Sequence, residues 1–286
     1  MTSSLSAGEH LRIVTTSQPR RRVLVTGGGS FLGDYIAAAL VAEGADVTLL
    51  VRPGAEDHLG GLAERVRWAT ADVWNPASLR GRARAHQCVV HTVGSLTADP
   101  AQGLTHQRLN FLSARNVINM CSSDGVPTCI LMSTTRAPWL NRGYVQAKRD
   151  AEEYVGRVGV SALIVRAPLV YRRGAPRSLF WRLISGLRHV PILGWLLRLN
   201  RIAPMPVDVL ARAVARAALN PRRVAKPILY APDLRRMNTR DERRGRGAGD
   251  FGRERAAAIR RAGRRADWLH AATVVTQTGP PGWATP

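Results

Sequence analysis

The sequence predicts an α/β protein in which a parallel sheet is covered by helices on both faces. Short apolar runs rich in Val, Ile and Leu recur through the first half of the chain, and segments with helical spacing of apolar residues lie between several of them. Strands that are apolar on both sides are typical of a parallel sheet buried between helices. Right-handed connections make this a doubly wound sheet, whose ligand site lies beyond the carboxyl ends of the strands.

The first strand, turn and helix are the clearest elements. A β-branched run at residues 23–26 stops at three consecutive glycines, and residues 31–43 then carry apolar side chains at helical spacing before Gly44. Further strands are expected at residues 47–51, 66–69, 88–92, 129–132 and 162–165.

The glycine turn is the first candidate binding site. It consists of Gly27, Gly28, Gly29, Ser30, Phe31, Leu32 and Gly33. A dinucleotide diphosphate requires N–H groups at a helix N-terminus and a turn without Cβ atoms in the way. A glycine turn placed directly after the first strand and before a helix meets both needs.

Composition limits the remaining possibilities. The 286 residues are 45% hydrophobic and 22% charged, as in ordinary globular proteins. The three cysteines have no CxxC spacing, so neither a disulfide framework nor a metal site is expected. The net charge is +22, but all 42 basic residues except Lys148 and Lys226 are Arg, a bias that resembles the codon usage of a GC-rich genome. Without interleaved aromatic residues or a recognition motif, nucleic acid is not an expected partner.

We predict a flexible N-terminus (1–20), a nucleotide-binding domain (21–234) with a small substrate-binding portion around residues 172–206, and a basic tail (235–286). The tail has many Arg among Gly and Ala and is expected to be largely disordered. No apolar stretch reaches the ~18 to 20 residues that cross a bilayer, and the N-terminus has no apolar signal region. A cytoplasmic location is expected, with a mitochondrial one as the alternative because the first 22 residues contain one acid and end in three Arg.

The glycine turn resembles the TGxxGxxG fingerprint of the short-chain dehydrogenase/reductase superfamily, in its extended and atypical branches. Gly27 and Gly33 match the outer glycines, whereas Ser30 stands at the middle glycine and Gly29 lies one position earlier. The resemblance spans roughly residues 22–234. It implies a Rossmann fold and a nicotinamide dinucleotide cofactor.

Arg52 follows the second strand, where an acid would bind a free ribose 2′-hydroxyl and a cation would bind a 2′-phosphate. NADP(H) is therefore favoured, with NAD(H) as the alternative.

The resemblance implies that Asp72 and Val73 bind adenine, although Asp72 could instead cap the following helix. It also implies that Thr92, Val93 and Gly94 line the cofactor and that Pro168 lies under the nicotinamide.

The motif Tyr144-Val-Gln-Ala-Lys148 places a tyrosine and a lysine on one face of a helix. The resemblance implies that Tyr144 is the acid/base, and that Lys148 lowers its pKa and binds the nicotinamide ribose. The third member is a hydroxyl after the fifth strand, with Thr135 the first choice and Ser133 the second. Asn110 resembles a position that orders active-site water or the lysine, and a helix-surface role is the alternative.

Residues 178–199 interleave Trp and Leu with Arg, which suits either an interfacial helix or a helix packed on the sheet. The order of motifs resembles the group of the complex I nucleotide-binding accessory subunit and the coenzyme Q biosynthesis reductase-like proteins. We therefore predict an NADP(H)-dependent oxidoreductase acting on a small apolar carbonyl, quinone or isoprenoid-like substrate, with a peripheral membrane contact through this segment. The alternatives are a non-catalytic accessory or assembly protein of a membrane redox system and a nucleotide-sugar epimerase or dehydratase. The sequence does not indicate an oligomeric state.

Overall fold

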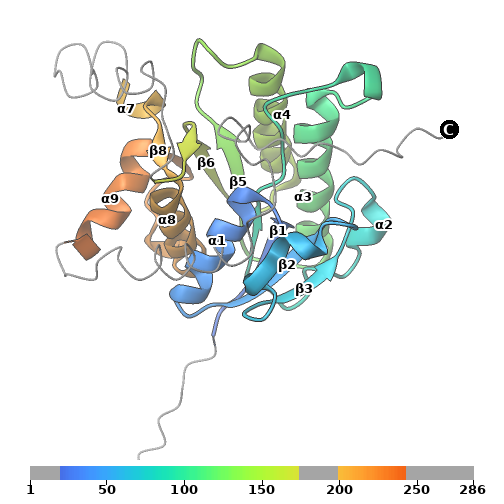
Figure 1. Ribbon diagram of the computed structural model, residues 1–286, viewed down its shortest axis with the longest axis horizontal. Helices are drawn as coiled ribbons and strands as arrows, with labels where there is room; N and C mark the ends of the chain where they lie inside the picture. Colours follow the sequence, from blue (N-terminus) through green and yellow to red (C-terminus); the bar gives the residue numbers. More distant parts are fainter. Residues whose placement is uncertain (1–19, 174–198, 243–286) are drawn as a thin grey trace, which may run out of the picture.

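A computed structural model describes residues 20–173 and 199–242 of the protein. Its main sheet has seven parallel strands in the order β3-β2-β1-β4-β5-β6-β9 (Figure 1). These strands are β1 (Arg22–Gly28), β2 (Asp46–Val51), β3 (Arg67–Thr70), β4 (Cys88–His91), β5 (Cys129–Thr134), β6 (Ala162–Ala167) and β9 (Ile228–Tyr230). The order turns back between β1 and β4, so the predicted doubly wound Rossmann fold is confirmed.

Helices cover both faces of this sheet. They are α1 (Phe31–Ala42), α2 (Pro76–Leu79), α3 (Ser113–Ser123), α4 (Arg142–Val158), α7 (Leu199–Ile202), α8 (Val207–Leu219) and α9 (Ala231–Glu242). Shorter turns are η1 (Glu56–Leu62), η2 (Pro100–Gln102), the π-helical η3 (Gln107–Leu112) and η4 (Pro221–Arg223). Helices α1 and α8 pack on one face, whereas α2, α3 and α4 pack on the other.

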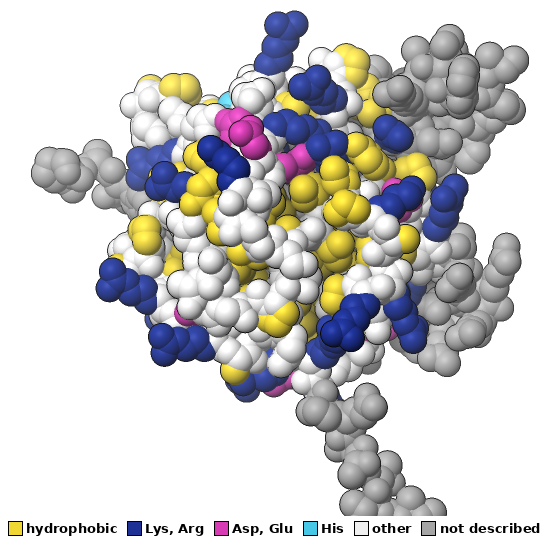
Figure 2. All heavy atoms as spheres, turned by 180° about the vertical axis from the view of Figure 1, so that it is seen from behind, with side chains coloured by type: hydrophobic (Ala, Val, Ile, Leu, Met, Phe, Trp, Pro, Cys, Tyr) yellow, Lys and Arg dark blue, Asp and Glu magenta, His cyan; other side chains and the backbone are white. Residues whose placement is uncertain are grey.

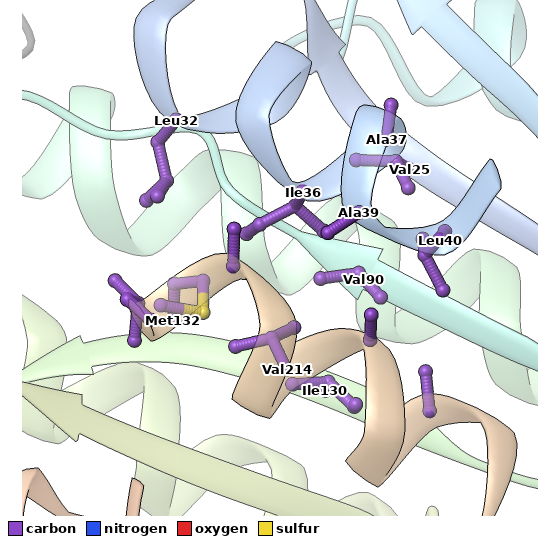
Figure 3. Close-up of a cluster of buried hydrophobic side chains, with 14 of the residues drawn as sticks. Val25, Leu32, Ile36, Ala37, Ala39, Leu40, Val90, Ile130, Met132 and Val214 are labelled. Carbon is purple, nitrogen blue, oxygen red and sulfur yellow. The ribbon is translucent and has the colours of Figure 1, made fainter. Parts of the chain in front are cut away.

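The alternation of side chains along the strands divides the core between the two faces. Figure 3 shows Ile36 of α1 and Val214 of α8 packed with Val90, Ile130 and Met132 of the central strands. Neighbouring strand residues point the other way, toward α2, α3 and α4. Both faces are apolar, which is why these strands are uninterrupted apolar runs in the sequence.

The C-terminal part of the fold contains a strand that the sequence did not predict. Strand β9 extends the main sheet, with Ile164 of β6 opposite Ile228. A strand of three residues is too short to show a period in the sequence. Helix α9 continues past the expected boundary at residue 234, and Leu234 and Asn238 are buried.

The described part of the predicted substrate-binding portion is small. Strands β7 (Val170–Tyr171) and β8 (Met205–Pro206) form a separate parallel pair, and α7 precedes β8. The N-terminal segment 1–19, almost all of segment 178–199 and the tail beyond residue 242 lie outside the described residues.

Two further properties concern the described ranges alone. Within residues 20–173 and 199–242, none of the helices has both the length and the apolar content of a transmembrane span. On the face shown in Figure 2, Lys and Arg side chains are scattered rather than gathered into one patch.

Candidate active site

The glycine turn joins β1 to α1 through a close backbone contact. A Cβ atom at Gly33 would lie 2.1 Å from the carbonyl oxygen of Gly27, so the first turn of α1 can rest on the loop only with glycine at this position. Gly29 has a φ of 77°, in the left-handed region that favours glycine. The backbone geometry of the loop therefore requires glycine at position 33 and favours it at position 29.

Ser30, which departs from the fingerprint, fits the turn without strain. Its φ is −106°, a value open to any residue, and it caps α1. The Ser30 hydroxyl donates to the Gly27 carbonyl oxygen at 2.5 Å and accepts from the Gly33 N–H at 3.3 Å. In the described part of the chain, the N–H groups of Phe31 and Leu32 have no acceptor. These donors at a helix N-terminus fit the diphosphate of a dinucleotide.

Asp34 is a buried member of this loop that the sequence analysis did not single out. Its carboxylate accepts the Gly29 N–H at 2.9 Å, and the side chain lies in the first turn of α1. A negative charge at this position interacts favourably with the helix dipole. The sequence indicated this role by placing an acidic residue in the first turn of the expected helix.

Arg52 lies next to the glycine turn. It directly follows β2, whose last residue, Val51, pairs with Gly28 of β1. The following loop approaches the turn as well, since a Cβ at Gly29 would lie 2.8 Å from the Ala55 carbonyl oxygen. The structure thus brings Arg52 to the edge of the sheet where a cofactor ribose phosphate is expected.

Asp72 and Val73 take local roles in the structure. The Asp72 carboxylate accepts the Trp74 N–H at 2.9 Å, and Val73 is buried in the core. Asn75, rather than Asp72, caps α2 by accepting the Ala77 N–H at 3.0 Å. Asp72 nevertheless stands at the carboxyl end of β3, in line with the other candidate residues.

The segment after β4 is held against both the glycine turn and α4. The Thr92 hydroxyl donates to the Thr26 carbonyl oxygen at 2.5 Å. A Cβ at Gly94 would lie 2.5 Å from Asn110 Oδ1 and 2.6 Å from Lys148 Nζ, so the small residue allows these two side chains to come close. Asn110 is fully buried and receives the Ser95 N–H at 3.0 Å, which excludes the helix-surface alternative.

His91 packs beneath this segment as a neutral ring. Its Nδ1 lies 2.9 Å from the Thr26 hydroxyl, and its exposed fraction is 1%. Burial and the positive charge of Lys148 together lower the pKa of His91 to about 3, so the ring is neutral at physiological pH.

Lys148 is buried among these groups. Its Nζ donates to the Val93 carbonyl oxygen at 3.4 Å. Burial lowers the pKa of Lys148 to about 8, an effect that the Glu152 carboxylate opposes. The ammonium is therefore poorly satisfied by the protein alone, which fits a residue that binds the hydroxyls of a ribose.

Tyr144 lies in the first turn of α4. Asn141 caps this helix by accepting the N–H groups of Gly143 at 2.8 Å and Tyr144 at 3.4 Å. The Tyr144 ring meets the His106 ring edge to face, with centroids 6.1 Å apart. Burial raises the pKa of Tyr144 to about 12, and the positive charge of Arg149 acts in the opposite direction.

The three hydroxyls after β5 have different surroundings. Ser133 donates to the Glu152 carboxylate at 2.5 Å, below the site. Thr134, which the sequence analysis did not select, donates its hydroxyl to the Thr135 carbonyl oxygen at 3.2 Å. Thr135 Oγ1 is buried and has no hydrogen-bond partner among the described residues. Thr135 therefore remains available to a substrate oxygen, whereas Ser133 and Thr134 are engaged.

Pro168 follows β6 and is buried. The next residue, Leu169, accepts the Met205 N–H at 3.0 Å and so connects the site to the β7–β8 pair. Pro168 thus lies at the carboxyl edge of the sheet with the other candidate residues. No group of three or more potential metal ligands comes together in the described ranges.

The burial of Lys148 leads to a stability prediction. Its pKa of about 8 lies below the ordinary lysine value of 10.5, so between these pH values the unfolded chain holds the extra proton and the free energy of unfolding rises with pH. Lys148→Met should be more stable than the wild type below pH 8. The difference should shrink by up to ~3 kcal/mol toward pH 10.5, as measured by urea unfolding across this range.

Lys226→Met is the matched control, because the Lys226 side chain is 64% exposed. Tyr144 and the cysteines also titrate, but they do so in both proteins. Their contributions therefore cancel when the free energy of unfolding of the variant is compared with that of the wild type. If the stability difference between Lys148→Met and the wild type does not change with pH, Lys148 is solvated in the folded protein.

The fold and this site define a protein of the NAD(P)H-binding Rossmann class. The glycine turn, the buried lysine and the tyrosine all lie at the carboxyl edge of the sheet. The chain belongs to the NAD(P)H-binding family, whose sequence profile matches residues 27–177.

Curated relatives include proteins that are named as reductases. The chain is 27% identical over 222 residues to an uncharacterized chloroplast protein of Arabidopsis thaliana, covering 68% of this chain and 71% of that protein. It is 30% identical over 195 residues to the ceramide reductase of Caulobacter vibrioides, covering 68% of this chain and 60% of the relative. It is also 30% identical over 128 residues to cinnamoyl-CoA reductase 1 of Oryza sativa, covering 43% and 37%.

Solved structures share the fold. A short-chain dehydrogenase/reductase from Serratia marcescens has a TM-score of 0.53 at 16% identity, covering 73% of this chain and 94% of that one. UDP-galactose 4-epimerase has a TM-score of 0.52 at 19% identity, covering 73% and 75%. The Bordetella bronchiseptica enzyme WbmH, solved with NAD+, has a TM-score of 0.52 at 20% identity, covering 70% and 72%.

Proposed function

We propose that the protein is an NADP(H)-dependent reductase of a carbonyl or quinone group in an apolar, isoprenoid-like substrate. The observation that carries the proposal is that α4 places Tyr144 one helical turn before the buried Lys148, while β5 ends at the buried, unpartnered hydroxyl of Thr135. A proton donor, a hydroxyl and an ammonium at the carboxyl edge of the sheet are the groups that carbonyl reduction needs.

The residues present fit the cofactor. The turn from Gly27 to Gly33 would hold the diphosphate, Arg52 the 2′-phosphate, and Lys148 the nicotinamide ribose. The remaining candidate contacts are Asp72, Val73, Thr92, Val93, Gly94 and Pro168. When bound, the cofactor supplies the hydride that adds to the carbonyl carbon.

Tyr144 supplies the proton in this proposal. Because burial raises its pKa to about 12, Tyr144 is protonated at neutral pH and is ready to donate. The C=O π bond becomes a C–H bond and an O–H bond, and the tyrosine is left as the conjugate base. The Thr135 hydroxyl would orient the carbonyl oxygen. The protonated state supports reduction as the favoured direction.

The relatives support a reductase rather than an epimerase. Two curated relatives are named as reductases, and the name ceramide reductase supports an apolar substrate. The apolar, Arg-edged sequence of residues 178–199 supports a substrate portion or membrane contact of the same character. A nucleotide-binding accessory protein without turnover is the outcome to exclude.

NADPH should bind more tightly than NADH to the wild-type protein. Arg52→Asp should remove or reverse this preference, by ~1 to 3 kcal/mol, because it replaces the phosphate partner with a repelling charge. Calorimetric titration of both cofactors measures the effect. Arg65→Asp is the control, since the exposed Arg65 precedes β3 at the opposite end of the sheet. Equal affinity of the wild type for both cofactors would contradict the assignment.

Turnover tests the proposed reaction itself. We expect loss of NADPH absorbance on addition of a long-chain ketone or a short-chain quinone. Binding of NADPH without turnover of either substrate would favour the accessory-protein alternative. Absence of any dinucleotide binding would overturn the whole proposal.

A further inference from the structure

An open cavity lies at the amino end of the main sheet, away from the candidate active site. Its volume is about 560 Å³, and it is formed where β1, β2 and β3 begin, beside the end of α1 (Figure 1). The first residues of these three strands, Arg22, Asp46 and Arg67, are all part of its wall. The candidate active-site residues lie at the carboxyl edge of the sheet, so this cavity is separate from the proposed cofactor site.

Arginine dominates the charged part of the wall. Four arginines and two acidic residues line the cavity: Arg20, Arg22, Arg65, Arg67, Asp46 and Glu64. The lining therefore has a net charge of +2. The planar fork of a guanidinium binds the oxygens of a phosphate in pairs. A phosphate monoester, with a charge of about −2 at neutral pH, matches this lining.

The protein leaves part of these donors unused. Arg67 Nη2 donates to Asp46 Oδ2 at 2.6 Å. The same oxygen lies 3.9 Å from Arg22 Nε, beyond hydrogen-bond reach, and Nε is buried without a partner among the described residues. The side chains of Arg22 and Arg67 are 38% and 54% exposed. Asp46 thus neutralises at most one of two guanidinium groups that are open to a ligand.

The rest of the wall is aliphatic. Val41 of α1 and Val66 before β3 pack against the core, and Ala45 and Val47 are buried beside them. The cavity is larger than a phosphate group alone requires, and its volume is in the range of small-molecule sites. A ligand that fills it therefore has an apolar group next to its phosphate.

We propose that this cavity binds a phosphate monoester with a short apolar group. The guanidinium groups of Arg22 and Arg67 hold the phosphate, and the aliphatic wall contacts the apolar group. A free organic phosphate and the headgroup of phosphatidic acid in a membrane both present this chemistry. The inference concerns a second ligand and is independent of the proposed reductase function.

Calorimetric titration with hexyl phosphate tests the cavity. The wild type should bind hexyl phosphate more tightly than inorganic phosphate, because only hexyl phosphate has an apolar group to bury. Arg22→Gln and Arg67→Gln should each weaken the binding of hexyl phosphate by ~10-fold, the scale of a hydrogen bond between charged groups. Asp46→Asn removes the competing carboxylate and should strengthen binding, a result that loss of folding cannot produce.

Arg157→Gln is the matched control, because the exposed Arg157 lies on α4 over the Tyr154 ring, outside the cavity. Arg52→Asp should also leave the affinity for hexyl phosphate unchanged, since it alters only the proposed cofactor site. The source of the ligand is tested by cosedimentation with phosphatidylcholine vesicles, with and without phosphatidic acid. Binding that requires phosphatidic acid and is lost in Arg22→Gln and Arg67→Gln assigns a membrane headgroup, whereas binding of hexyl phosphate alone assigns a free organic phosphate.

Two results would overturn the proposal. One is that the wild type binds neither hexyl phosphate nor the vesicles with phosphatidic acid. The other is that Arg22→Gln and Arg67→Gln bind these probes as tightly as the wild type, which would place the phosphate elsewhere on the protein.

Discussion

Tyr144→Phe is expected to lower the turnover number by at least ~100-fold and to leave NADPH affinity within about twofold. The change removes one oxygen, and a positioned proton donor contributes on this scale. The ring remains, so its packing against His106 is kept. Steady-state kinetics and calorimetric titration of NADPH together measure the two effects.

Tyr154→Phe provides the control on the same helix. The Tyr154 hydroxyl bonds to Asn119 Oδ1 at 2.7 Å, so this variant also removes a bonded hydroxyl from α4, but away from the site. It should retain turnover. If Tyr144→Phe keeps the activity of the wild type, Tyr144 is not the proton donor and the accessory-protein alternative gains support.

The sheet was predictable from the sequence because its strands are buried on both faces. Residues 129–132 are continuously apolar, residues 47–51 are interrupted only by Thr48, and both runs lie within observed strands. Strand β9 escaped prediction because its three residues pair only with β6, at the edge of the sheet. Helix α9 was assigned to the tail because the tail is rich in Arg, although Leu234 and Asn238 are buried in the described fold.

The candidate site was predictable where spacing determines contact. Tyr144 and Lys148 share a helix face, and Gly27 and Gly33 meet in the turn, because local geometry fixes both pairs. The choice among Ser133, Thr134 and Thr135 depends on partners far away in the sequence. Ser133 is engaged by Glu152, 19 residues further along the chain.

The same reason explains why the ion pair between Arg149 and the buried Glu152 was not predicted. In a chain with so many Arg, one more on a helix carries little information. Arg149 also donates to the Thr134 carbonyl oxygen, and only the folded chain brings these three residues together. Sequence spacing could show that Arg149 and Glu152 lie on one face of α4, but not that this face meets the end of β5.

Gly33→Ala is expected to weaken NADPH binding by at least ~100-fold, because the turn and the start of α1 must separate. The new Cβ would lie 2.1 Å from the Gly27 carbonyl oxygen and 3.1 Å from Ser30 Oγ, and the backbone oxygen cannot rotate away. Such overpacking costs ~1 to 3 kcal/mol of folding stability. It also moves the N–H groups of Phe31 and Leu32, which would hold the diphosphate.

Gly156→Ala separates this effect from a general response to a larger side chain. Gly156 lies in α4, and a Cβ there would meet nothing within 4 Å. Its replacement should leave NADPH binding unchanged and raise the free energy of unfolding by ~0.5 to 1 kcal/mol, because glycine is a poor helix former. Circular dichroism identifies a temperature at which both variants are folded, and calorimetry then compares them. If Gly33→Ala binds NADPH as the wild type does, the turn is not the diphosphate site, since no arrangement of that loop accommodates both the methyl group and the observed backbone contact.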